Sequence, residues 1–379
     1  MTTRQFRRLA RLPGPQLPDG DVHLEPPPEL SRPLPRNVLM TLMPVVMIGG
    51  MVGFIVISGG GTSSMLMGGM MAMSMIGMLM NGTGRQGKSP AAVDEERKDY
   101  LRYLSTMRGV VRTTAASQRA AQLWAHPDPE ALMGIARSRR LWERRRSDAD
   151  FCQVRIGRGT QRLATRLVPP QTGPVEELEP VSALALRRLV RAHAAVPDLP
   201  IAVELRSFPV VALGGEDPRA LARAILTQAC TLHTPEDLVV AVVSAGPERG
   251  HWEWTKWLPH AQHPAESDAI GRIRMVTPTL AEAEEWLRPQ LADRPRFTRT
   301  GSRAVDGPHV VIVLDGPVIT GEERVLVSDG LAGVTLLDLS GSTGTLASRR
   351  GLRLNASGGS PGCRWSRRDR AASLRPARR

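Results

Sequence analysis

Two long uncharged runs near the start of the chain dominate its hydrophobic pattern. Residues 38–57 carry no charged side chain, and about twenty residues is the length with which a helix crosses about 30 Å of hydrocarbon. A second uncharged run, rich in methionine, covers residues 65–80. A signal peptide is the alternative, but the first run is too long for its apolar core and 37 residues precede it. The pattern therefore predicts a two-span transmembrane helical hairpin over residues 38–80.

The charges on either side of these runs predict an orientation. The loop between the runs is uncharged, and Arg85 and Lys88 follow the second run. Six arginines precede the first run: Arg4, Arg7, Arg8, Arg11, Arg32 and Arg36. Basic residues stay on the cytoplasmic side of a membrane. We therefore expect a multi-pass protein of the inner (plasma) membrane, with both termini cytoplasmic and a basic cytoplasmic segment over residues 1–37.

A helical period follows the predicted hairpin. From Pro90 onward apolar residues recur at helical spacing within a polar segment, at Leu101, Leu104, Met107 and Val111. Asp128 and Pro129 suit the cap and first turn of a further helix, which we expect to run to about Arg146. Residues 81–150 are thus predicted to form a linker and a helical stalk.

Beyond residue 150 short apolar strands alternate with helical segments. Strand-like runs include VVALGG at 210–215, LVVAVV at 238–243 and HVVIVL at 309–314. Such alternation predicts an α/β domain with a largely parallel sheet, here over residues 151–345. Residues 346–379 lack periodicity and are rich in arginine, so we expect a disordered tail there.

Composition narrows the classes of function. The 379 residues carry a net charge of +13, but the arginines cluster without interleaved aromatic side chains, so we expect no nucleic-acid partner. Cys152, Cys230 and Cys363 are odd in number and widely spaced, which fits neither a disulfide framework nor a zinc site. The soluble part is expected in a reducing compartment.

Residues 82–89, GTGRQGKS, match the P-loop pattern G-x-x-x-x-G-K-[ST]. A phosphate-binding loop needs a buried strand before it and a helix N-terminus after it, so that backbone N–H groups converge on the anion. A methionine-rich run stands before this motif instead. We interpret the motif as a basic linker at the membrane surface.

A second nucleotide-like feature lies inside the α/β domain. Gly214 and Gly215 end a predicted strand that leads into a helix, where a P-loop would stand, but the lysine and the Ser or Thr of a P-loop are missing. Asp315 ends a buried strand, like the aspartate that orients magnesium in P-loop enzymes, and Gly316 stands where many such ATPases carry a glutamate. The pattern predicts a degenerate P-loop-ATPase-like domain with Gly214, Gly215 and Asp315 as a degenerate site for ATP and Mg²⁺. We assign no catalytic residue.

Residues 251–263, HWEWTKWLPHAQH, gather three histidines and three tryptophans. Their spacing does not bring the three histidines together with an acid, so we predict no metal site. Tryptophans are strong interface anchors, and we expect Trp252, Trp254 and Trp257 to form a partner surface.

Six segments, together with the two uncharged runs, resemble the N-terminal region of EccC-type components of type VII secretion systems, which are membrane-anchored relatives of the FtsK/SpoIIIE ATPases. The segments are YLRYL at 100–104, WAHPDPEAL at 124–132, VRIGRG at 154–159, WEWTKWLPH at 252–260, RPRF at 294–297 and GVTLLDLSG at 333–341. The resemblance extends to about Leu354.

The resemblance implies a place in an inner-membrane secretion complex beside EccB-, EccD- and EccE-type subunits, which exports small WxG-type substrates. In that family a stalk and a degenerate ATPase domain precede complete FtsK-type ATPase modules. This chain stops before such modules, so we expect a scaffold and coupling region that lacks its motor and meets WxG-type substrates only through the missing modules. The alternatives are an ATP-hydrolysing subunit that energises secretion and an FtsK-like DNA translocase.

Overall fold

The computed structural model describes residues 8–30, 49, 73, 90–298, 305–327 and 329–356. It divides into two compact units. The sheet unit comprises Met1–Pro18, Ala115–Arg162 and Ala195–Arg379, and the stalk unit comprises Asp19–Thr114 and Leu163–Ala194. Within the described residues, no helix is both long and apolar enough to cross a membrane. The predicted hairpin over 38–80, except positions 49 and 73, and the motif at 82–89 lie outside the described residues.

The stalk unit contains most of the long helix α3 (Pro90–Ala125), which confirms the predicted stalk helix. It also holds η3 (Val175–Glu177) and α5 (Pro180–His193), and Glu179 caps α5 by accepting hydrogen bonds from Val181 N and Ser182 N. Strand β1 (Asp21–His23) pairs in parallel with β3 (Arg166–Val168). One apolar cluster joins these elements, and its buried members are Leu24, Tyr100, Leu104, Leu186 and Leu189.

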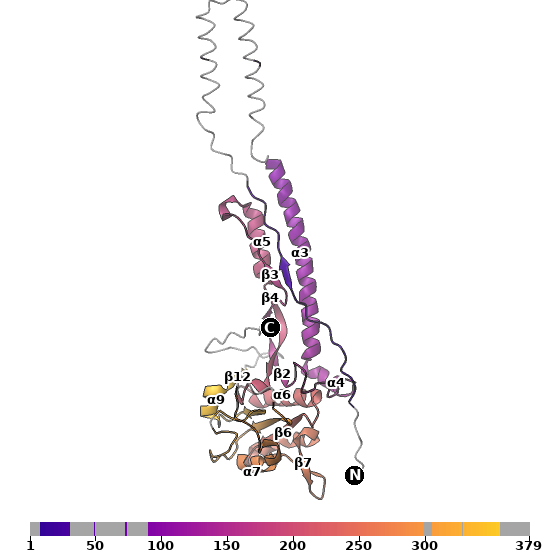
Figure 1. Cartoon of the computed structure of the whole chain (residues 1–379), viewed down its shortest axis with the longest axis vertical. Helices are drawn as coiled ribbons and strands as arrows, with labels where there is room; N and C mark the ends of the chain where they lie inside the picture. Colours follow the sequence, from indigo (N-terminus) through magenta and orange to yellow (C-terminus); the bar gives the residue numbers. More distant parts are fainter. Residues whose placement is uncertain are drawn as a thin grey trace, which may run out of the picture. The chain divides into compact units, whose positions relative to one another are not determined.

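Six parallel strands form the core of the sheet unit, in the order β12-β5-β11-β10-β6-β9. Two of them, β12 and β6, are labelled in Figure 1. They are β5 (Val210–Gly215), β6 (Leu238–Val243), β9 (Val276–Thr277), β10 (His309–Leu314), β11 (Val334–Asp338) and β12 (Leu352–Ala356). Every residue of β6, β10 and β11 is buried, as expected of strands that are covered on both faces. The predicted largely parallel α/β sheet is therefore confirmed.

Helices and a second, antiparallel layer complete the sheet unit. The helices are α6 (Pro218–Leu232), α7 (Leu280–Trp286), α8 (Arg288–Leu291) and α9 (Gly344–Arg350). Strand β2 (Gln153–Arg162) pairs antiparallel with β4 (Ala195–Glu204), and β7 (Gln262–Ser267) with β8 (Arg272–Arg274). Single helical turns are η4 (Leu205–Ser207) and η6 (Pro259–Ala261), and η5 covers Gly246–Trp257. Side chains from α6, β2, β5, β6 and β10 share one core cluster, which positions the ends of these strands.

The sheet unit extends further along the chain than the sequence pattern predicts. A disordered tail is expected from residue 346, but α9 and β12 continue the fold to Ala356. Strand β12 pairs with β5, and Leu346 and Leu354 are buried in the two core clusters. That boundary is wrong because alternate leucines supply enough apolar contact for an edge strand even in an arginine-rich sequence. Residues 357–379 lie outside the described residues.

The helix predicted to run to Arg146 is also shorter than expected. A single turn, η2 (Pro129–Ala131), leads into α4 (Leu132–Ala136), after which the chain turns. Arg140 pairs with Glu143 at 2.6 Å, and the buried Arg144 pairs with Asp150 at 3.1 Å. These arginines belong to the interior of the sheet unit, and the ion pairs replace the continued helix.

Part of the basic N-terminal segment also belongs to the sheet unit. Arg8 donates hydrogen bonds to Trp142 O at 2.9 Å and to Asp237 at 3.0 Å. Arg11 pairs with Asp148 and Asp150. Basic side chains that precede the first predicted span are thus held by carboxylates from distant parts of the sequence.

Candidate functional site

The predicted nucleotide site lies at the carboxyl ends of the parallel strands. Gly214 and Gly215 end β5, and Asp315 follows β10. In open α/β sheets this edge is where ligands usually bind, because loops leave the strands there and helix N-termini point toward it. The fold therefore places Gly214, Gly215 and Asp315 at the carboxyl ends of strands of the same sheet.

Asp315 is fully engaged by neighbouring side chains. Its Oδ2 accepts a hydrogen bond from Arg219 Nε at 2.8 Å and another from Trp252 Nε1 at 2.9 Å, and its Oδ1 accepts from Arg219 Nη2 at 3.1 Å. Arg219 also forms an ion pair with Glu248. Asp315 is 5% exposed. A carboxylate that would orient magnesium is instead neutralised by a bidentate guanidinium.

Arg219 comes from the helix that follows the β5 loop. It is the second residue of α6, after Pro218, and thus stands close to where a P-loop enzyme presents its phosphate-binding groups. The hydrogen bond to Asp315 is the main cause that raises the pKa of Arg219 above its ordinary value. The guanidinium therefore supplies the positive charge that a bound cation would bring.

The loop between β5 and α6 is closed to phosphate in two further ways. The side chain of Asp217 accepts a hydrogen bond from Ala220 N at 2.8 Å and so occupies the helix N-terminus with a carboxylate. A Cβ at Gly214 would lie 2.9 Å from Asn355 Oδ1 on β12, so close strand packing accounts for this glycine. The residues of this site do not fit a magnesium nucleotide: the carboxylate, the helix end and the glycine each have another partner.

The three tryptophans do not form one surface. Trp252 is 1% exposed and packs in the main core cluster, and Trp254 packs against the same cluster. Trp257 is 78% exposed. The predicted three-tryptophan partner surface is wrong for Trp252, because its indole N–H is needed to satisfy the buried Asp315. Trp257 as a partner contact stays a prediction.

The histidines near this segment are structural. His260 is buried and its Nε2 bonds to His233 O at 2.8 Å. His233 Nε2 in turn accepts a hydrogen bond from Cys152 N at 3.0 Å. Across the ranges that the structure describes, no group of three histidine, cysteine or acidic side chains could hold a metal ion. Burial lowers the pKa of His233 to about 3 and that of His260 to about 4, so both rings are neutral.

Sequence reasoning missed Arg219 and Glu248, the partners that close the site. From sequence alone, an arginine in the first turn of a helix is normally predicted to be exposed to solvent. The available signal was the proline at the first position of α6, which fixes the start of the helix and hence the place of Arg219. Asp338, at the end of β11, was also missed; it accepts hydrogen bonds from Ser340 N, Ser342 N and Thr343 N and shapes the turn that follows β11.

Comparison with known proteins points to one group. No family model matches the chain. It is 42% identical over 360 residues to the ESX secretion system protein EccC of Thermomonospora curvata, which covers 93% of this chain and 27% of that protein. In Mycobacterium tuberculosis it is 41% identical over 283 residues to the ESX-4 protein EccC4, covering 72% of this chain and 23% of the relative. There it is also 34% identical over 362 residues to the ESX-1 protein EccCa1, with 91% and 47% covered. The chain thus spans between 23% and 47% of the length of these relatives.

Proposed function

Because the chain is an EccC-type sequence of ESX secretion systems, we propose that it acts as a membrane-anchored scaffold and coupling region of a type VII protein secretion complex. The single observation that carries this proposal is the bidentate bond between Arg219 and Asp315. The bond engages the carboxylate that a magnesium nucleotide would need, which supports an ATPase-like frame that does not use nucleotide. A domain of this kind suits the transmission of movement between subunits rather than its generation.

The contacts of the stalk unit support membrane anchoring by an even number of spans. Glu25 precedes the uncharged runs, and Tyr100 and Tyr103 follow them. Tyr100 Oη donates to Glu25 O at 2.9 Å, and Glu25 N donates to Tyr103 Oη at 2.9 Å. The chain before and after the runs meets in one folded unit, which supports placing both flanks on the same side of a membrane. A two-span hairpin over residues 38–80 meets this condition and a single span does not.

Labelling of single cysteines tests this topology. In full-length chain with Cys363 replaced by serine, Ser63→Cys lies between the two runs and Arg85→Cys lies after them, while the native Cys152 and Cys230 are buried. A membrane-impermeant maleimide added to intact protoplasts should label Ser63→Cys and spare Arg85→Cys. Labelling of Arg85→Cys alone, or of both sites, would contradict the proposed hairpin and orientation.

Partner subunits follow from the same proposal. We expect the chain to dock on other membrane subunits of an ESX system, of the EccB, EccD and EccE types. Tagged full-length chain, solubilised from membranes with mild detergent, should co-purify with these subunits in the absence of added nucleotide. If the chain is present in the membrane and none of the three subunits co-purifies with it, the scaffold proposal is wrong.

A further inference from the structure

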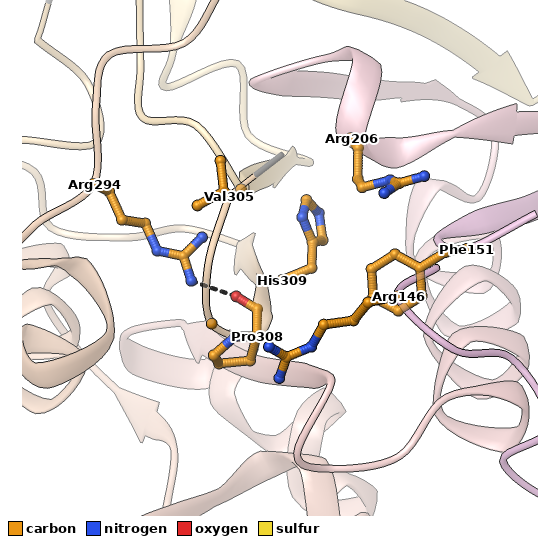
Figure 2. A pocket seen from close by; sticks show the side chains of 9 residues that line it. Arg146, Phe151, Arg206, Arg294, Val305, Pro308 and His309 are labelled. Atoms are coloured by element: carbon orange, nitrogen blue, oxygen red, sulfur yellow. Dashed lines mark hydrogen bonds between the residues drawn. The ribbon is translucent and has the colours of Figure 1, made fainter. Parts of the chain in front are cut away.

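A small basic pocket lies at the amino ends of the parallel strands, opposite the carboxyl ends where Asp315 lies. His309 begins β10, and Gly333 directly precedes β11. Asp315 stands six positions after His309, which corresponds to about 20 Å at the rise of a β-strand. Figure 2 shows the side chains that line the pocket, which are Arg146, Phe151, Arg206, Arg294, Val305, Pro308 and His309. Its free volume of about 30 Å³ is more than the roughly 10–15 Å³ that a single water molecule needs, so the pocket has room for a larger polar group.

Arg294 brings a buried positive charge to this pocket. The residue is 7% exposed, and it donates to Gln290 O at 2.6 Å, to Ala332 O at 3.2 Å and to Pro308 O, the last drawn as a dashed line in Figure 2. All three of its hydrogen bonds within the described residues go to backbone carbonyl oxygens rather than to a carboxylate. A buried guanidinium held only by carbonyl oxygens favours a nearby anion, because carbonyls carry no net charge.

Arg146 adds positive charge at the rim. Its Nε donates to Asp237 at 2.7 Å, but the same carboxylate also pairs with Arg8 at 3.0 Å. Two arginines therefore share one negative charge. Burial lowers the pKa of Arg294, and the nearby Arg146 lowers it further, as expected of like charges that face each other without an anion between them.

His309 specifies what kind of anion fits. Its Nε2 lies 3.2 Å from Thr335 Oγ1, and that hydroxyl donates its single proton to Leu205 O at 2.8 Å. Phe208 O, at 3.0 Å, is a second acceptor for this proton, so the hydroxyl suits the acceptor role toward His309. In the tautomer that matches this role, Nε2 carries the ring proton and Nδ1 keeps a lone pair. Within the described part of the chain, His309 Nδ1 is buried and has no hydrogen-bond partner. This nitrogen needs a donor, which sulfate or an ionised carboxylate cannot provide.

We propose that the pocket formed by Arg146, Arg294 and His309 binds inorganic phosphate in its hydrogen-phosphate form. The phosphate oxygens accept hydrogen bonds from the guanidinium groups, and the P–OH group donates to His309 Nδ1. A protonated oxoanion satisfies both the excess positive charge and the buried lone pair, which no unprotonated anion does. This inference does not depend on the proposed secretion role, because the site lies at the other edge of the sheet from Arg219 and Asp315.

Equilibrium dialysis of detergent-solubilised full-length chain against radiolabelled phosphate at pH 7 tests the proposal. Ionic strength is held constant with chloride, and sulfate is the competitor. We expect saturable binding at one site, which sulfate displaces at least tenfold less well than unlabelled phosphate. Arg146→Gln should weaken phosphate binding by about tenfold or more, since it removes a charge-assisted contact.

The exposed Arg272 provides the matched control. Arg272→Gln lowers the net charge by the same amount but changes no residue of the pocket, so it should leave phosphate affinity unchanged. Equal losses in Arg146→Gln and Arg272→Gln would show a general charge effect and overturn the site. Absence of saturable binding, or equal displacement by sulfate and phosphate, would overturn it in the wild-type chain without any variant.

Discussion

Arg219 donates to both carboxylate oxygens of Asp315, from Nε at 2.8 Å and from Nη2 at 3.1 Å. The bond joins the first turn of α6 to the end of β10, which are 96 positions apart in the sequence. It holds together the edge of the sheet at which an ATPase would bind its nucleotide. The same two residues therefore hold α6 to the end of β10 and leave the Asp315 carboxylate unavailable to a nucleotide-bound magnesium ion.

Removal of Arg219 should destabilise the sheet unit. Arg219→Gln leaves the buried Asp315 with Trp252 as its remaining side-chain donor, so we expect a loss of about 1–3 kcal/mol in the free energy of unfolding, reduced from the cost of a fully buried pair because Arg219 is partly exposed. Urea unfolding of the full-length chain measures it. Arg288→Gln, which breaks an exposed pair with Glu285, is the control and should change stability by less than about 0.5 kcal/mol.

Substitutions of Trp252 and Trp257 should have different effects on stability and on partner binding. Trp252→Ala removes a buried side chain and a donor to Asp315, so we expect a loss of about 3–5 kcal/mol in unfolding free energy. Trp257→Ala removes an exposed side chain and should leave the urea midpoint unchanged within error. If Trp257 contacts a partner subunit, its variant loses co-purification while keeping stability. A destabilised Trp257 variant would contradict its exposed position.

Gly333 and Gly341 offer a matched pair of glycine substitutions. Both have a left-handed backbone, with φ of +72° and +74°. A Cβ at Gly333 would collide with the guanidinium of Arg294, whereas a Cβ at Gly341 meets nothing within 4 Å. Gly341→Ala should cost about 1 kcal/mol from backbone strain alone, and Gly333→Ala should cost at least 1 kcal/mol more through the clash. Equal unfolding midpoints for the two variants would contradict the position of Arg294.

Buried histidines should make the sheet unit sensitive to acid. Burial lowers the pKa of His233 and His309 to about 3 and that of His126 and His260 to about 4, all below the ordinary value of 6.5. The unfolded chain therefore binds protons below pH 6.5 that the folded chain does not, and stability falls as the pH falls from 6.5 toward 4. Each such histidine contributes about 1.4 kcal/mol per pH unit to the slope in this window.

Urea unfolding between pH 7.5 and 4.5 measures this slope. His260→Gln should reduce it by the contribution of one histidine. A stability that is flat from pH 6.5 to 4.5 would show that the histidines are accessible to protons in the folded state.

The sequence predicted the parallel sheet well because β6, β10 and β11 are continuous apolar runs. Such runs leave little choice but burial on both faces. It could not predict β12, whose leucines alternate with polar residues and whose place depends on an edge that β5 leaves open. The prediction that Trp252 belongs to a partner surface was wrong for a related reason. An indole suits an interface and a core equally, and only its hydrogen bond to Asp315, distant in the sequence, favours the core.

The closure of the predicted nucleotide site was equally beyond sequence reasoning. Missing P-loop residues at Gly214 and Gly215 indicated a degenerate site, but they did not indicate what had taken their place. The three residues involved are far apart in the sequence: Arg219, Glu248 and Asp315. They come into contact only because α6 and η5 lie beside the end of β10. The basic pocket around Arg294 and His309 has the same character, because its side chains come from five separate segments.

A titration with ATP analogue decides whether the site at Asp315 is closed to nucleotide. The chain should carry Lys88→Ala, so that residues 82–89 cannot contribute, and a fluorescent ATP analogue with Mg²⁺ should be titrated into the solubilised protein. The account predicts no saturable binding up to millimolar analogue, because Arg219 and Trp252 occupy the carboxylate of Asp315. Saturable, magnesium-dependent binding that Asp315→Ala abolishes would contradict the account and restore the nucleotide site.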